Sequence, residues 1–172
     1  MNAYDMPTSL MVGGVEQPIR SGWRVAIDIF TMYADPDFDS EMKAVGLVKM
    51  IYPNWRDIPP EAIPEAIEKA CEFLDGGKKA NKKKGPRLVD WEADAPLIVP
   101  AVNAVAGMDI RRDPGIHWWT VLGWYMSIEN SLFSSVLRIR KKRAEGMPLD
   151  KQEKDWYRHN HELVDLKSRY TK

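Results

Sequence analysis

Apolar residues at helical spacing recur along most of the chain. In the clearest stretch, apolar side chains fall at i, i+3, i+4, i+7 and i+11, which places them on one face of a helix: Trp23, Ala26, Ile27, Phe30 and Ala34. Ser21 is positioned to cap this helix. The same pattern, interrupted by proline, glycine and capping residues, predicts further helices over residues 40–51, about 63–74, about 90–106, 117–128, 131–144 and from 150 onward.

Prolines fix where two of these helices begin. A start at Pro60 would set the ring of Pro64 against the carbonyl four residues before it, so we expect Pro64 in the first turn. Pro96 and Pro100 require either a late start or a kink in the helix expected over residues 90–106.

The N-terminal residues follow a different pattern. Two short apolar segments, residues 10–12 and 15–19, flank Gly13-Gly14, and a Gly-Gly pair supplies the positive φ angles of a two-residue hairpin turn. The predicted fold class is therefore mainly α, with about six helices around one core and a short N-terminal β-hairpin.

The composition is that of an ordinary globular protein. A chain of 172 residues with 44% hydrophobic and 29% charged side chains suits one domain, residues 1–172. The apolar runs are too short to cross a bilayer, and the N-terminus lacks the pattern of a secretory signal. We expect a cytoplasmic protein without a membrane partner.

Charge is distributed unevenly along a chain whose net charge is zero. Residues 1–75 carry 6 basic and 13 acidic side chains, whereas residues 76–172 carry 19 basic and 12 acidic ones. Either these charges mix on the folded surface, or acidic and basic faces survive folding and guide head-to-tail contact between copies.

Residues 78–87 form the most basic and least apolar segment. They carry six positive charges and no apolar side chain larger than alanine or proline, which is typical of a mobile loop. Lys82, Lys83 and Lys84 at its centre are candidate contacts for a partner.

Residue types that carry catalysis are present, but not in the arrangements that catalysis needs. His159 and His161 stand two positions apart on a predicted helix, so they point in different directions and cannot easily share a metal ion. His117 lies beside two tryptophans, where a hydrogen-bonded structural histidine is the usual case. Cys71 has no histidine near it in sequence, and neither Gly-Gly pair fits a phosphate loop. We expect a protein that is not an enzyme and has no catalytic residue, metal or cofactor.

One helix is expected to end in a dense basic run, with five positive charges in six residues: Arg138, Arg140, Lys141, Lys142 and Arg143. A basic helix can lie along phosphate groups. Cations also gather at the C-terminal end of a helix because they complement its dipole. Since the chain is neutral overall, we do not expect nucleic acid to be the main partner.

Aromatic residues are concentrated between positions 118 and 125. Such clusters usually build a core, although tryptophan and tyrosine also dominate interface hot spots. Trp118 and Trp119 are adjacent and cannot face the same way, so one of them is a candidate to contact a second layer or a partner.

Four short segments stand in a recognisable order along the chain: FLDGGK at 73–78, DWEADAPLI at 90–98, GMDI at 107–110 and HWW at 117–119. With the N-terminal hairpin and helix, and with DWYR at 155–158, they resemble a phage family named gene product fifteen. That family is found in tail-gene clusters of long-tailed phages of Gram-positive bacteria. The chain departs from the family pattern in a proline-rich insertion at 59–64 and in its basic loop.

The resemblance implies a role in tail assembly, similar to small helical chaperones encoded just before the tape-measure protein. Those proteins keep the long helices of the tape measure soluble until tail-tube subunits polymerise around it. The expected partners are thus the tape-measure protein, the tail-tube protein and further copies of this chain. The expected place is the host cytoplasm during assembly and not the mature virion. The alternatives are a structural virion component and a nucleic-acid-binding protein that uses residues 138–143.

Overall fold

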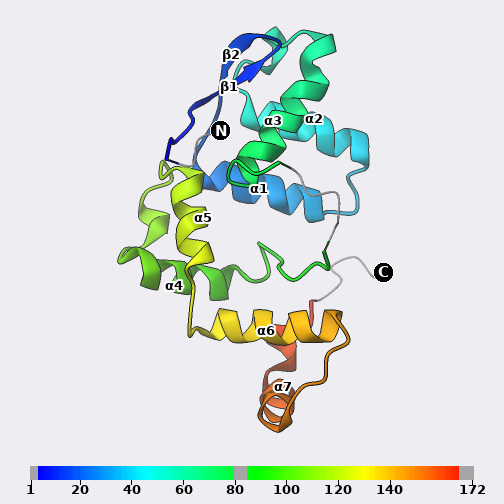
Figure 1. Cartoon of the computed structure of the whole chain (residues 1–172), viewed down its shortest axis with the longest axis vertical. Coiled ribbons are helices and arrows are strands. Elements are labelled where there is room, and N and C mark those ends of the chain that lie inside the picture. Colours follow the sequence, from blue (N-terminus) through cyan, green and yellow to red (C-terminus); the bar gives the residue numbers. More distant parts are fainter. Residues whose placement is uncertain (1–3, 80–84, 167–172) are drawn as a thin grey trace. The chain divides into compact units, whose positions relative to one another are not determined.

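The computed structural model describes residues 4–79 and 85–166. These residues contain an antiparallel hairpin and seven α-helices, joined by turns and loops (Figure 1). The predicted fold class, mainly α with an N-terminal hairpin, is confirmed. The chain divides into two compact units, one of Met1–Lys82 with Arg111–Gly123 and the other of Lys83–Ile110 with Trp124–Lys172. The single domain over residues 1–172 stays a prediction. Among the described residues, no helix is both long and apolar enough to span a membrane.

The first unit contains the hairpin, three complete helices and the start of a fourth. They are β1 (Ser9–Val12), β2 (Val15–Pro18), α1 (Trp23–Ala34), α2 (Ser40–Ile51), α3 (Ile63–Leu74) and the first part of α5 (Trp118–Met126). Short 3-10 turns at Trp55–Asp57 and Pro60–Ala62 lead into α3, and Pro64 lies in its first turn as predicted.

The hairpin lies against α3 (Figure 1). Gly13 and Gly14 have φ angles of 58° and 75°, which confirms the predicted glycine turn. Leu10 and Val12 are buried, and the N–H of Gly13 donates to Oε2 of Glu65 at 2.8 Å. The turn is thereby tied to the helix beneath it.

The start of α1 differs from the prediction. Its N-cap is Gly22, not Ser21. The carbonyl of Ser21 instead accepts the N–H of Trp118 at 2.7 Å, and the N–H of Trp23 donates to the carbonyl of Ile116 at 3.0 Å. The backbone N–H groups at the start of α1 were expected to donate to the Ser21 side chain. The segment that forms a β-bridge between Gly22 and His117 provides a backbone acceptor instead.

The core of the first unit lies where α1, α2, α3 and α5 pack together. Its fully buried side chains include Ile29, Leu47, Ile51, Tyr52, Phe73 and Trp118. The hydroxyl of Tyr52 donates to the carbonyl of Ala66 at 2.9 Å, and burial raises its pKa, so this phenol stays protonated. Gly46 lies where α2 packs on α1, and a Cβ at this position would come within 2.3 Å of Sδ of Met32, so the end of that flexible side chain would have to move.

The second unit contains the end of α5 and three further helices, α4 (Ala95–Ala106), α6 (Leu132–Ala144) and α7 (Lys151–Val164). α4 begins late, which places Pro96 in its first turn, whereas Pro100 lies inside the helix. α7 begins with a capping box, in which Asp150 and Glu153 each accept the other's backbone N–H. The buried side chains that hold these helices together include Ile98, Val102, Phe133, Val136, Ile139 and Val164.

Candidate partner-binding surfaces

The two adjacent tryptophans of α5 donate hydrogen bonds to the end of α3. Trp118 is 1% exposed, and its indole Nε1–H donates to the carbonyl of Leu74 at 2.8 Å. Trp119 is half-buried, and its Nε1–H donates to the carbonyl of Phe73 at 2.7 Å. The last carbonyls of a helix have no partner within it, so the indole of Trp118 satisfies that of Leu74. The carbonyl of Phe73 also accepts the N–H of Gly76 at 3.1 Å. Trp118 is therefore a core residue, and Trp119 presents only part of its ring to a partner.

His117 completes this arrangement as a structural residue. Its Nδ1 accepts the N–H of Trp119 at 3.1 Å, so the proton lies on Nε2, which donates to the carbonyl of Pro7 at 3.0 Å. Phe73 lies edge-on to His117 and is stacked on Trp119. The FLDGGK and HWW segments thus meet at the end of α3, where they stabilise the fold of the first unit.

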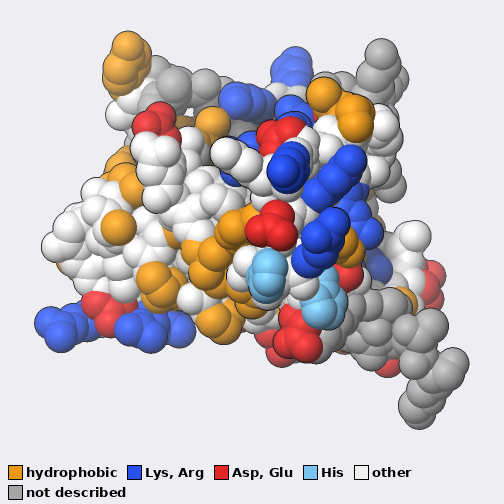
Figure 2. Space-filling model, turned by 90° about the horizontal axis from the view of Figure 1, so that it is seen from below, with side chains coloured by type: hydrophobic (Ala, Val, Ile, Leu, Met, Phe, Trp, Pro, Cys, Tyr) orange, Lys and Arg blue, Asp and Glu red, His pale blue; other side chains and the backbone are white. Residues whose placement is uncertain are grey.

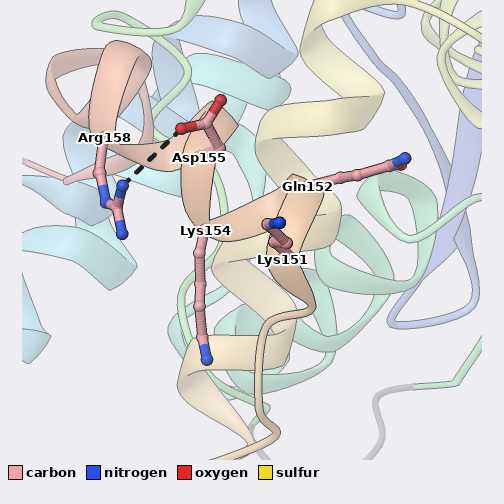
Figure 3. Close-up of a pocket in the computed structure, with 5 residues that line it drawn as sticks. All are labelled: Lys151, Gln152, Lys154, Asp155 and Arg158. Carbon is pink, nitrogen blue, oxygen red and sulfur yellow. Dashed lines mark ion pairs between the residues drawn. The ribbon is translucent and has the colours of Figure 1, made fainter.

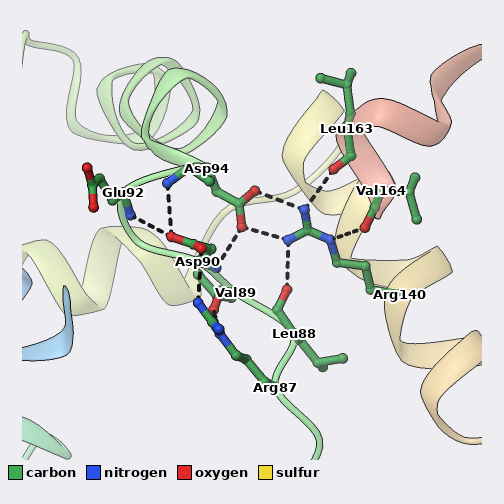
Figure 4. Close-up of polar contacts among 10 residues, drawn as sticks. Arg87, Leu88, Val89, Asp90, Glu92, Asp94, Arg140, Leu163 and Val164 are labelled. Atoms are coloured by element: carbon green, nitrogen blue, oxygen red, sulfur yellow. Dashed lines mark hydrogen bonds and ion pairs between the residues drawn. The ribbon is translucent and has the colours of Figure 1, made fainter. Parts of the chain in front are cut away.

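In the second unit, Asp90 and Asp94 shape the turn before α4 (Figure 4). Oδ1 of Asp90 accepts the N–H groups of Glu92 and Ala93 at 3.2 and 3.0 Å, while Oδ2 pairs with Arg87 at 2.9 Å. The N–H of Asp90 donates to Oδ2 of Asp94 at 2.9 Å. The DWEADAPLI segment is therefore a structural turn, and it fixes the carboxylate of Asp94 in the interior.

Arg140, which sequence reasoning offered as a contact for a partner, is the buried partner of that carboxylate. Its side chain is 5% exposed and forms a bidentate pair with Asp94 at 2.6 and 2.9 Å. The other guanidinium donors reach three backbone carbonyls at 2.7 to 2.9 Å, those of Leu88, Leu163 and Val164 (Figure 4). All five N–H donors of an arginine are thus used inside the protein. Arg140 joins the turn before α4 to the end of α7.

A signal for this role was present in the sequence. Phe133, Val136 and Arg140 stand at i, i+3 and i+7, so Arg140 continues the buried stripe of α6. The density of positive charge over residues 138–143 masks this periodicity, because it groups the buried Arg140 with its exposed neighbours.

Most of the other cations of this run hold α7 onto α6. Nζ of Lys142 lies 2.7 Å from both carboxylate oxygens of Glu153, and Nε of Arg138 lies 3.6 Å from Oε1 of the same residue. Arg143 pairs with Asp165 and lies over the ring of Tyr157, with Cζ 4.5 Å from the ring centroid. The run therefore acts largely as a clamp between helices, which leaves few of its charges for phosphate groups.

The ionisation of the carboxylates reflects this clamp. The hydrogen bond from Lys142, followed by the backbone N–H of Asp150, lowers the pKa of Glu153. Burial acts to raise the pKa of Asp165, but hydrogen bonds from Arg143 and Tyr157 and nearby positive charge outweigh it and leave the pKa lowered. Both carboxylates are therefore held in their charged form at neutral pH.

The remaining predicted cations are in different places. Lys141 is exposed on α6 and is available to a partner. Lys82, Lys83 and Lys84 lie outside the described residues, and so does half of the predicted loop at 78–87. Their role in binding stays a prediction.

A basic surface that sequence reasoning missed lies on α7. Lys151, Lys154 and Arg158, at i, i+3 and i+7, line an open hollow of about 640 Å³ with Gln152 and Asp155, and Figure 3 shows Lys154 and Arg158 pointing the same way. The face seen in Figure 2 carries clustered Lys, Arg and His side chains. The sequence could have indicated this surface, because cations at i, i+3 and i+7 lie on one face of a helix.

The side chains considered for chemistry are engaged within the fold. The described residues contain no group of three or more His, Cys, Asp and Glu side chains placed to hold a metal ion. Nδ1 of His159 lies 2.8 Å from the carbonyl of Asp155, and Nδ1 of His161 lies 3.3 Å from that of Arg158. Burial, with a smaller effect of Asp75, raises the pKa of the Cys71 thiol, which disfavours the reactive thiolate.

Methionine supplies much of the exposed apolar surface. Six methionines are between 41% and 66% exposed: Met6, Met11, Met42, Met108, Met126 and Met147. Methionine is flexible and polarisable, so an exposed set of them can adapt to apolar partners of different shape. Three of these side chains lie on each unit, and each is a candidate contact for an apolar partner.

Comparison with known proteins supports the resemblance seen in the sequence. The family model described as Bacteriophage Gp15 protein matches residues 4–166. No curated protein and no solved structure matches the chain. The match includes every segment that carried the resemblance, and three of those segments build the structural arrangements around Trp118 and Asp94. The chain belongs to the bacteriophage Gp15 protein family.

Proposed function

We propose that this protein is a non-enzymatic chaperone of phage tail assembly that binds the tape-measure protein. Membership of a phage family supports the setting. The observation that carries the proposal is the set of six exposed methionines on both units. Surfaces of this kind bind the apolar faces of amphipathic helices, and a tape measure offers many such faces in succession.

Adaptability suits a chaperone better than close shape complementarity. A chaperone must hold a long partner at many different segments and release it when tube subunits arrive. Unbranched side chains can repack against each segment, whereas a rigid surface would select one. The exposed methionines therefore fit transient and repeated contact.

Co-expression with the tape-measure protein encoded beside this chain tests the proposal. We expect the two proteins to purify as a complex. The variant Met108→Gln/Met126→Gln/Met147→Gln should lose the complex, and the matched variant with leucine at the same positions should keep it, because leucine preserves the apolar area. Absence of a complex with the wild-type chain would refute the proposal.

The proposed place of action is the host cytoplasm during assembly. Mass spectrometry of purified particles separates a chaperone from a structural component of the virion. We expect this chain to be absent or scarce beside the tube protein. A stoichiometric amount in the particles would favour the structural alternative.

A further inference from the structure

One ridge of α2 carries an acidic, an apolar and a basic side chain in turn along its length. Glu41, Val45 and Lys49 are spaced four residues apart, so they form a single row on the helix. All three are exposed, Val45 by 45%, and Met42 beside them is 47% exposed. The row spans about 12 Å at the helical rise of about 1.5 Å per residue.

The rest of the first unit holds this ridge outward. Leu47, Val48 and Ile51 of α2 are buried, and α2 packs on both α1 and α3. Gly46 of α2 faces the side chain of Met32 on α1. The ridge is therefore presented in one orientation.

The two ends of α2 extend the charge difference. Asp37 and Asp39 are exposed just before the helix, and Asp39 caps it by accepting the N–H of Met42 at 2.8 Å. At the other end, Nζ of Lys49 lies 4.9 Å from the ring centroid of Trp55, and Cζ of Arg56 lies 4.6 Å from it. The half-buried Trp55 prolongs the apolar surface between these cations.

We propose that two copies of this chain associate through α2, antiparallel, around a two-fold axis that passes near Val45. In this arrangement Glu41 of each copy faces Lys49 of the other, and Met42 and Val45 pack at the centre. A surface that reverses its charge along one axis is complementary to itself in the antiparallel direction, as a two-fold interface requires. The parallel direction would set Glu41 against Glu41 and Lys49 against Lys49.

The inference does not rest on the proposed function, because it concerns the purified chain alone. Sedimentation velocity should show a dimer for the wild-type chain and a monomer for Val45→Asp, since this change buries a carboxylate at the axis. Circular dichroism must show that the variant keeps its helical content. A conservative variant, Val45→Leu, should remain dimeric.

Charge reversal tests the direction of pairing. Glu41→Lys and Lys49→Glu should each weaken self-association by about ten-fold or more, because each sets like charges opposite one another twice. An equimolar mixture of the two variants should restore a dimer, now a heterodimer. The double variant Glu41→Lys/Lys49→Glu should also dimerise with itself. The control Lys154→Glu, on α7, should leave the dimer unchanged.

Several results would overturn the inference. A wild-type chain that is monomeric or forms open-ended oligomers at the concentrations tested contradicts a two-fold dimer. A dimer that survives Val45→Asp with folding intact places the interface elsewhere. Failure of the mixture to associate, while each single variant is folded and monomeric, contradicts pairing through the charges at positions 41 and 49.

Discussion

Replacing Arg140 with methionine removes the group that compensates the buried carboxylate of Asp94. Methionine fills much of the same volume but provides none of the five donors that reach Asp94, Leu88, Leu163 and Val164. Asp94 is 3% exposed, so its carboxylate would lose the guanidinium in the interior and keep the N–H of Asp90 as its donor among the described residues. Three carbonyls would lose a donor at the same time.

The size of the effect follows from the burial of the pair. Removing one partner of a buried ion pair costs about 3–5 kcal/mol of folding free energy. Lys141→Met is the matched control, because Lys141 is adjacent and exposed, and such surface changes stay within about 0.5 kcal/mol. The double variant Arg140→Met/Asp94→Leu should recover part of the loss, since it removes both charges together.

Native-state hydrogen exchange measures this effect where it is expected. Amides of α4, α6 and α7 should lose protection in Arg140→Met, while amides of α2 and α3 serve as an internal reference. Urea denaturation then gives the total change in the free energy of unfolding. If Arg140→Met costs no more than Lys141→Met, the structural role assigned to Arg140 is wrong.

Two further predictions concern the tryptophans and the α6–α7 clamp. Trp118→Phe should destabilise the chain by about 1–3 kcal/mol in urea denaturation, because the carbonyl of Leu74 loses a buried donor; Trp119→Phe should cost less, since water reaches that half-buried site. Equal costs for the two changes would contradict the assigned burial. The lowered pKa values of Glu153 and Asp165 stabilise the folded state above the ordinary carboxylate pKa, and this stabilisation is lost as the pH falls through the folded values. Hydrogen exchange of α7 should therefore show lost protection in acid, and a Glu153→Gln variant should show a weaker pH dependence. An unchanged dependence in that variant would show that Glu153 does not contribute.

Local periodicity explains why most of the helices could be predicted. The apolar stripe of α1 and the prolines at the starts of α3 and α4 act within one or two turns, so the sequence alone determines them. The N-cap of α1 was missed because a segment almost a hundred residues away supplies its backbone hydrogen bonds.

The candidate site was harder to predict, because it depends on contacts that are distant in sequence. Arg140 and Asp94 are 46 residues apart, and nothing local distinguishes Arg140 from its exposed neighbour except its place on the buried stripe. The charge difference between the two halves of the sequence also becomes smaller when the charges are counted by structural unit. The first unit carries 11 basic and 14 acidic side chains and the second carries 14 and 11, so the contrast between units is smaller than between halves.

The soluble yield of the tape-measure protein in co-expression tests the proposed chaperone role most directly. Burying the exposed part of one methionine contributes about 1 kcal/mol, so losing three should weaken binding by about a hundred-fold. We predict that the wild-type chain and the leucine variant of Met108, Met126 and Met147 keep the tape-measure protein in solution, and that the glutamine variant does not. The proposed chaperone role would be contradicted if the tape-measure protein were equally soluble with all three chains. It would also be contradicted if none of the three kept the tape-measure protein in solution.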